Sequence, residues 1–150
     1  MVEAAEVEVD KETGKVKVLS FATVQDAGLA LNPKILEGQI QGAAAQGIGW
    51  AFSENYNLEK GKMINATFQD YRMPTAADVP FMDAILVEVN SKVEPYGIRG
   101  AGEPPIVPTL AAFANAVHSA TGVRFKELPM TPEVVLNGIN SQSMQKKRPD

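Results

Sequence analysis

Apolar and polar residues alternate in two short stretches near the start of the chain. Residues 6–9 and 15–18 each carry an apolar side chain at every second position, which is the pattern of half-buried strands. Residues 10–14 between them end in glycine and predict a tight turn. We therefore expect a hairpin whose second strand continues to about Val24. The apolar run at residues 81–89 predicts another strand.

Two longer stretches have the end signals of helices. Asn32 followed by Pro33 is a typical helix start, and this helix is expected to reach about Ala51. The alanine-rich run after Pro108 predicts a second helix that ends at Gly122. Mostly antiparallel strands with these two main helices packed on them predict an α+β fold.

The last part of the chain becomes polar. Residues 131–133, Thr-Pro-Glu, again begin a helix, which is expected to end at residues 137–138, Asn-Gly. We expect residues 1–138 to form one module and residues 139–150 to form a polar, flexible tail.

The first predicted helix contains four glycines, and each costs a helix about 1 kcal/mol relative to alanine. Gln39, Gly42, Ala43 and Gln46 share one side and form a flat strip with an amide at either end. Two interpretations stay open. Either the small residues let the helix pack closely on a sheet, or the strip faces a flat, polar ligand that the glutamines orient. Polar interruptions disfavour a membrane dimer.

A second unusual stretch is residues 97–105, Gly-Ile-Arg-Gly-Ala-Gly-Glu-Pro-Pro. Its glycines allow the backbone to come close to a ligand, and its prolines stiffen the loop. The helix predicted after Pro108 follows, and a helix N-terminus favours the ionised form of a nearby carboxylate. We interpret Glu103 as a catalytic base in a fixed position.

The composition excludes several classes of site. The chain has no cysteine, and its only histidine is His118, so an iron–sulfur cluster and a thiolate or multi-histidine metal site are excluded. The net charge of −4 argues against nucleic-acid binding, and no apolar run approaches the roughly 20 residues of a membrane span. The acidic start lacks a signal-peptide pattern, so we expect a cytoplasmic protein.

Taken in order, these motifs resemble the molybdopterin-binding subunit of the xanthine dehydrogenase and aldehyde oxidase family. The resemblance covers about residues 7 to 138, and a complete subunit is several times longer. The matching blocks are residues 7–14, 26–28, 32–33, 38–49, 70–80, 100–105 and 128–132.

The resemblance implies hydroxylation of a purine, another N-heterocycle or an aldehyde, with water as the oxygen source and Glu103 as the base. It implies a molybdenum cofactor, as molybdopterin or its cytosine dinucleotide, beside Gln39, Gly42, Ala43, Gln46 and Gly102. The pterin's sulfurs hold the metal in that family, so no residue of this chain is expected to bind it directly.

The resemblance also implies partner chains in a hetero-oligomer. These are the remaining part of the molybdenum subunit and an iron–sulfur subunit, with a flavin (FAD) subunit as a further candidate. The expected substrate is a small molecule, with neither nucleic acid nor a membrane as partner. The alternative is a non-catalytic assembly or scaffold domain of the same fold.

Overall fold

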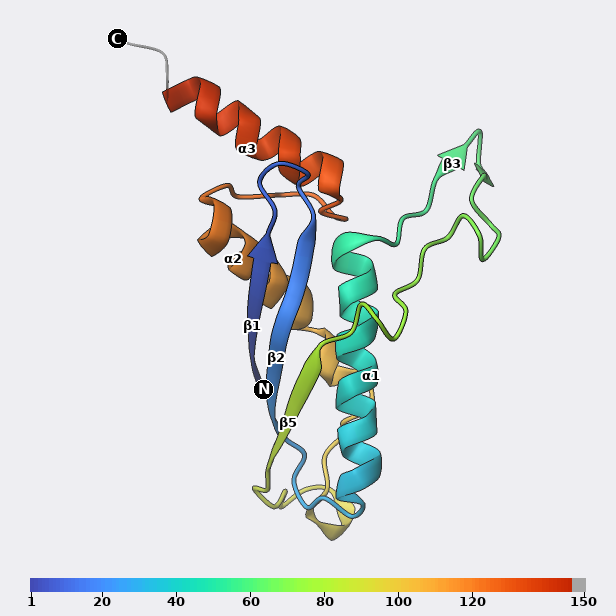
Figure 1. Cartoon of the computed structure of the whole chain (residues 1–150). Coiled ribbons are helices and arrows are strands. Elements are labelled where there is room, and N and C mark those ends of the chain that lie inside the picture. Colours follow the sequence, from blue (N-terminus) through green and yellow to red (C-terminus); the bar gives the residue numbers. More distant parts are fainter. Residues whose placement is uncertain (147–150) are drawn as a thin grey trace.

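The computed structural model describes residues 1–146, with a three-stranded sheet of order β1–β2–β5 at its centre (Figure 1). The strands are β1 (Val2–Val9), β2 (Val16–Asp26), β3 (Leu58–Glu59), β4 (Lys62–Met63) and β5 (Phe81–Val87). The β1–β2 hairpin and the small β3–β4 pair are antiparallel, whereas β5 runs parallel to β2. A parallel pair needs a long crossover, and the chain between β2 and β5 includes a helix.

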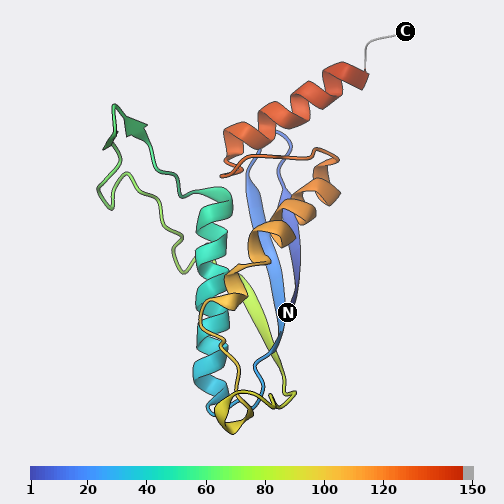
Figure 2. The same ribbon diagram turned by 180° about the vertical axis from the view of Figure 1, so that it is seen from behind.

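Three α-helices accompany the sheet, and two short 3-10 turns lie between β5 and the second helix. They are α1 (Pro33–Phe52), η1 (Pro95–Gly97), η2 (Pro104–Ile106), α2 (Thr109–Thr121) and α3 (Pro132–Lys146). Helix α2 lies behind the sheet in Figure 1 and in front of it in Figure 2, so it covers one face. Helix α1 runs alongside β5, and β3 and β4 lie on an arm that extends away from the sheet.

The α+β fold, the hairpin and the two main helices predicted from the sequence are confirmed. Asn32 caps α1 as expected, because its side chain accepts a hydrogen bond from Ile35 N at 3.1 Å. Gly122 ends α2 in the left-handed conformation, with φ of 75°. Local signals therefore set the bounds of these helices.

The helix end expected at Gly138 is wrong, since α3 continues to Lys146. A Cβ atom on Gly138 would lie 2.7 Å from the ring of Phe125, so this glycine allows close packing inside a helix. Further along, Gln142 Nε2 donates to Gly122 O at 2.9 Å. These contacts extend the helix through residues 139–146, where a tail was expected. The rest of that tail, residues 147–150, lies outside the described residues.

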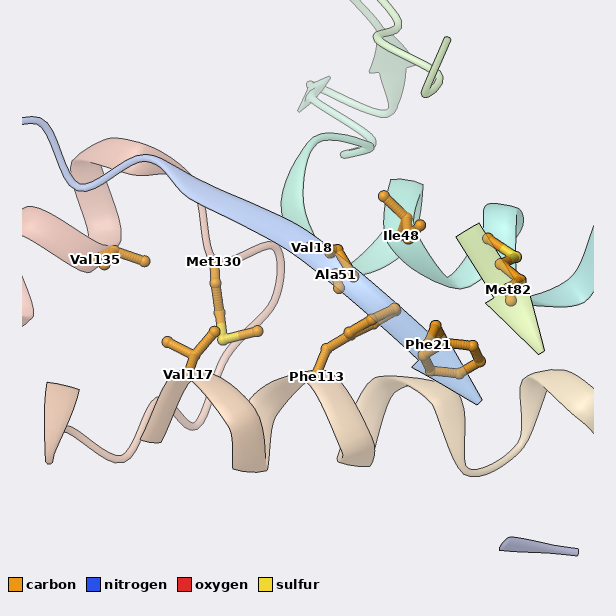
Figure 3. Packing of buried hydrophobic residues seen from close by; sticks show 10 residues of the cluster. Val18, Phe21, Ile48, Ala51, Met82, Phe113, Val117, Met130 and Val135 are labelled. Atoms are coloured by element: carbon orange, nitrogen blue, oxygen red, sulfur yellow. The ribbon is translucent and has the colours of Figure 1, made fainter. Parts of the chain in front are cut away.

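The core joins the sheet to all three helices (Figure 3). Phe21 of β2 and Phe113 of α2 point toward each other, with ring centroids 5.1 Å apart. Ile48 brings α1 to the same cluster, and Val135 brings α3. Because one face of α1 is committed to this core, its opposite face is left for other contacts.

Candidate functional site

A cleft of about 420 Å³ lies between α1 and the loop that carries η2. It brings together all six residues predicted from the sequence, which come from segments more than 50 positions apart. From α1 it is lined by Gln39, Gly42, Ala43, Gln46 and Trp50, and from the loop by Gly102, Glu103 and Ile106. The predicted helical strip and the predicted loop are therefore two walls of one cleft.

The surroundings of two glycines on α1 distinguish close packing from a ligand-facing strip as the reason for its small residues. A Cβ atom on Gly47 would lie 2.3 Å from Thr109 Cγ2, so Gly47 permits close packing against α2. A Cβ atom on Gly42 would meet nothing within 4 Å. Close packing within the described chain thus explains Gly47, but it does not explain the glycine that lines the cleft.

The loop wall is tied to the end of β2 where the loop begins. Gly28 has φ of 65°, and a Cβ atom there would lie 2.1 Å from Gly97 O, so only glycine fits this crossing. Arg99 N donates to Ala27 O at 2.8 Å. The Arg99 side chain also forms an ion pair of 2.6 Å with Asp26 Oδ2. This anchor holds the chain four residues before Glu103.

Asp26 is the charged centre of that anchor. Its Oδ1 accepts hydrogen bonds from Gly28 N at 2.9 Å and Val89 N at 3.3 Å. The Gly28 hydrogen bond contributes most to lowering the pKa of Asp26, and the Val89 bond and the Arg99 charge act in the same direction. The carboxylate is therefore ionised near neutral pH and joins three parts of the chain.

Glu103 itself begins the η2 turn. Its carbonyl oxygen accepts from Ile106 N at 3.1 Å, and its side chain makes no capping hydrogen bond. Helix α2 starts at Thr109, directly after Pro108 as predicted, and Glu103 caps the 3-10 turn that precedes it.

Trp50 and Ile106 line the cleft but are absent from the sequence prediction. Trp50 follows Gln46 by four positions, so helical spacing extended by one turn was a signal that could have found it. Ile106 follows Glu103 by three positions, in a turn that was not predicted from the sequence. They add large apolar side chains to a cleft otherwise lined by glycine, alanine and polar residues.

Among the residues that the structure describes, Glu103 is the only charged one that lines the cleft. In the described part of the chain, no group of three or more His, Cys, Asp or Glu residues is arranged to hold a metal ion. Among residues 1–146, no helix is long and apolar enough to cross a membrane.

A larger hollow of about 860 Å³ lies between the start of β2, the end of α1 and residues 68–80. None of the predicted site residues lines it. Tyr71 at its edge donates to Glu54 Oε2 at 2.7 Å, and this bond is the main cause that raises the pKa of Tyr71 to about 12. The hollow holds no carboxylate comparable to Glu103 in a glycine-rich loop, so the smaller cleft is the candidate site.

Comparison with known proteins agrees with the sequence motifs. A family described as "Molybdopterin cofactor-binding domain" matches residues 1–80, which include the α1 wall but not Glu103. The putative xanthine dehydrogenase molybdenum-binding subunit of Escherichia coli is 42% identical over 127 residues. That match covers 83% of this chain but only 17% of the relative, so this chain spans less than a fifth of its length.

Solved structures extend the likeness beyond residue 80. Quinoline 2-oxidoreductase from Pseudomonas putida 86 is 35% identical, with a TM-score of 0.86 over 98% of this chain and 18% of that chain. Aldehyde oxidoreductase from Desulfovibrio gigas is 37% identical, with a TM-score of 0.83 over 91% of this chain and 15% of that chain. The sequence resemblance is thereby confirmed, and the chain belongs to the molybdopterin cofactor-binding domain family of the molybdenum hydroxylases.

Proposed function

We propose that this chain is the C-terminal catalytic module of a molybdenum hydroxylase and that Glu103 is its base. The observation that carries the proposal is the cleft in which Glu103 and the Gln39–Gln46 strip face one space. The proposed reaction oxidises a purine, another N-heterocycle or an aldehyde, with water as the oxygen source. The names of the relatives, which refer to xanthine, quinoline and aldehydes, support this range of substrates.

The residues present fit a flat cofactor with polar edges. A Cβ atom at Gly42 or Gly102 would meet nothing within 4 Å, so both walls leave room for a group from outside the described chain. The amides of Gln39 and Gln46 each donate and accept hydrogen bonds, as the ring edges of a pterin require. The open glycine between two amides is the feature that a pterin in this cleft would explain.

When bound, the cofactor supplies the metal that activates water and accepts electrons. The chain's own residues orient the cofactor and shield the reacting groups from water. Gln39 and Gln46 hold the cofactor edge, while Trp50 and Ile106 restrict water on either side. Glu103 accepts the proton at a carboxylate oxygen, and the η2 turn holds its backbone.

Partner chains follow from the size of the relatives and the absence of cysteine. The molybdenum-binding subunit of Escherichia coli is about six times as long as its match to this chain. We therefore propose the remaining part of such a subunit, an iron–sulfur subunit and a flavin subunit as partners. Electrons leave through their cofactors, because no cysteine here can ligate a cluster. The cytoplasmic location stays a prediction.

The test replaces Glu103 with glutamine in the assembled complex. The chain is co-expressed with the remainder of the molybdenum subunit and its electron-transfer partners, and oxidation of purines, N-heterocycles and aldehydes is followed with an artificial acceptor. We expect Glu103→Gln to keep its molybdenum content and to lose about 10²–10⁴-fold in kcat, the usual contribution of a general base. Glu37→Gln on an exposed position of α1 is the matched control.

Two results would contradict the proposal. Full activity of Glu103→Gln would show that another group is the base. A correctly assembled complex without molybdenum, measured by mass spectrometry, would instead favour the scaffold alternative.

A further inference from the structure

The inner face of the sheet changes from apolar to polar at the end nearest Glu103. Glu3 of β1 pairs with Thr23 of β2, and this is the next pair on the same face of the sheet after Ala5 and the core residue Phe21. Thr23 Oγ1 donates to Glu3 Oε1 at 3.3 Å. Gln25, two positions further along β2, is only 2% exposed. A polar layer, buried at Thr23 and Gln25 and half-buried at Glu3, therefore lies where the apolar core stops.

Thr109, the first residue of α2, connects this layer to the η2 turn. It is fully buried, and its Oγ1 donates to Pro105 O at 2.8 Å. Its methyl group occupies the space left open by Gly47 of α1. Pro105 follows Glu103 by two positions, so one side chain links α1, α2 and the turn that carries the proposed base.

The side chain of Glu3, on β1 of the sheet, lies beside the Thr109 hydroxyl group. Burial raises the pKa of the Glu3 carboxyl, while hydrogen bonds involving the Thr109 and Thr23 hydroxyls oppose this shift. Within the described chain, Glu3 Oε2 and Gln25 Oε1 are buried without a hydrogen-bond partner. The Glu3 carboxyl thus lies beside the Thr109 hydroxyl and joins α2 to the sheet.

Thr109 therefore donates its hydroxyl proton to the η2 turn, while the Glu3 carboxyl lies beside it.

We propose that Thr109, supported by the half-buried carboxyl group of Glu3 beside it, is a positioning residue that fixes the η2 turn and thereby Glu103 in the cleft. This inference rests on the proposed function of Glu103 as the base. Thr109 itself does not line the cleft, so it acts only through the turn.

The first test compares Thr109→Val with Thr109→Ser in the co-expressed complex. Valine keeps the shape beside Gly47 but removes the hydroxyl group, whereas serine keeps the hydroxyl group. We expect Thr109→Val to lower kcat by about 10–100-fold with an unchanged KM and molybdenum content, because small displacements of a catalytic group reduce rate steeply. Thr109→Ser should restore most of that loss.

A second readout does not depend on turnover. Ile106 N and Val107 N donate hydrogen bonds within η2, so hydrogen–deuterium exchange of peptides that contain them reports on the turn. We expect exchange there to be about 10-fold faster in Thr109→Val and close to the parent rate in Thr109→Ser. Glu3→Leu should also accelerate exchange, whereas Glu3→Gln, whose amide can donate to Thr109, should not. If Thr109→Val fails to fold, the comparison of Glu3→Leu with Glu3→Gln tests the inference instead.

Parent-like exchange in both Thr109→Val and Glu3→Leu would overturn the inference, even if Glu103→Gln had already supported the proposed function. Equal defects in Thr109→Val and Thr109→Ser would also overturn it, because the hydroxyl group would then not matter. If Glu103→Gln were fully active, the proposed function would fail, and the role in positioning a base would fail with it. Faster exchange in Thr109→Val would then still show that Thr109 holds the turn.

Discussion

Two glycines on opposite faces of α1 show how differently the same residue can be used. Gly47 faces the core, where the Thr109 methyl group occupies the space in front of it. Gly42 faces the cleft, where nothing in the described chain comes within 4 Å of the position of a Cβ atom. Both destabilise the helix by about 1 kcal/mol relative to alanine. At Gly47 close packing offsets this loss, whereas at Gly42 nothing in the described chain does, and the proposed cofactor would supply the missing contact.

Among the substitutions that follow from this comparison, Gly47→Ala should change the stability of the chain most. Gly47→Ala places a methyl group 2.3 Å from Thr109 Cγ2, and both residues are buried. We expect the free energy of unfolding to fall by about 1–3 kcal/mol, the usual loss from overpacking, despite the better helix propensity of alanine. Urea unfolding followed by circular dichroism measures the change. An equally stable variant would mean that α1 and α2 can separate without loss.

The opposite effect on stability is predicted at Gly42. Gly42→Ala should raise the free energy of unfolding by about 0.5–1 kcal/mol, because alanine restricts the unfolded chain and meets no neighbour. In the co-expressed complex, the molybdenum content should fall, and it should fall further for Gly42→Leu.

Gly38→Ala is the matched control for Gly42. Gly38 lies in the same helix, is equally free of neighbours and does not line the cleft. It should gain similar stability without losing molybdenum. Unchanged molybdenum content in Gly42→Leu would contradict the assignment of the α1 strip to the cofactor.

The smallest effect is predicted for the anchor of the loop wall. The lowered pKa of Asp26 means that its ionised form stabilises the folded chain above its ordinary pKa of 3.8. This contribution is lost as the pH falls through the lowered value. Asp26→Asn should therefore be less stable than the parent near neutral pH, and the difference should shrink in acid.

The Asp26 effect should be smaller than that of either glycine, because partly exposed ion pairs contribute little and are screened by salt. Urea unfolding of parent and Asp26→Asn over a range of pH values measures it. A stability difference that stays constant into strong acid would show that the Asp26 carboxylate is not what holds the loop.

Residues with local signals were predicted well. The alternation in β1 and β2, the Asn32 cap and the Gly122 stop each act within a few positions, so the chain around them contains the information. Gly138 has a stop signal of the same kind but lies within α3, because Phe125 packs against it. Whether a glycine ends a helix depends on a neighbour that local sequence does not identify.

The candidate site also combines residues that sequence motifs identify with an arrangement that only the fold creates. Gln39, Gly42, Ala43, Gln46, Gly102 and Glu103 were selected from motifs, and their catalytic and cofactor-binding roles stay predictions. Their juxtaposition in one cleft depends on the packing of α1 against η2. The ion pair between Asp26 and Arg99 joins residues 73 positions apart, and no local pattern announces it.

The sequence by itself determined the bounds of the main elements, the absence of cysteine ligands and the family to which the chain belongs. These depend on residue identity and on spacings along one segment. Only the tertiary structure decided which glycine of α1 is filled by Thr109 and which stays open, since that depends on what lies across from each one. It also decided that Thr109 of α2 packs against Gly47 of α1 and lies beside Glu3 of β1, because these contacts join segments far apart in the sequence.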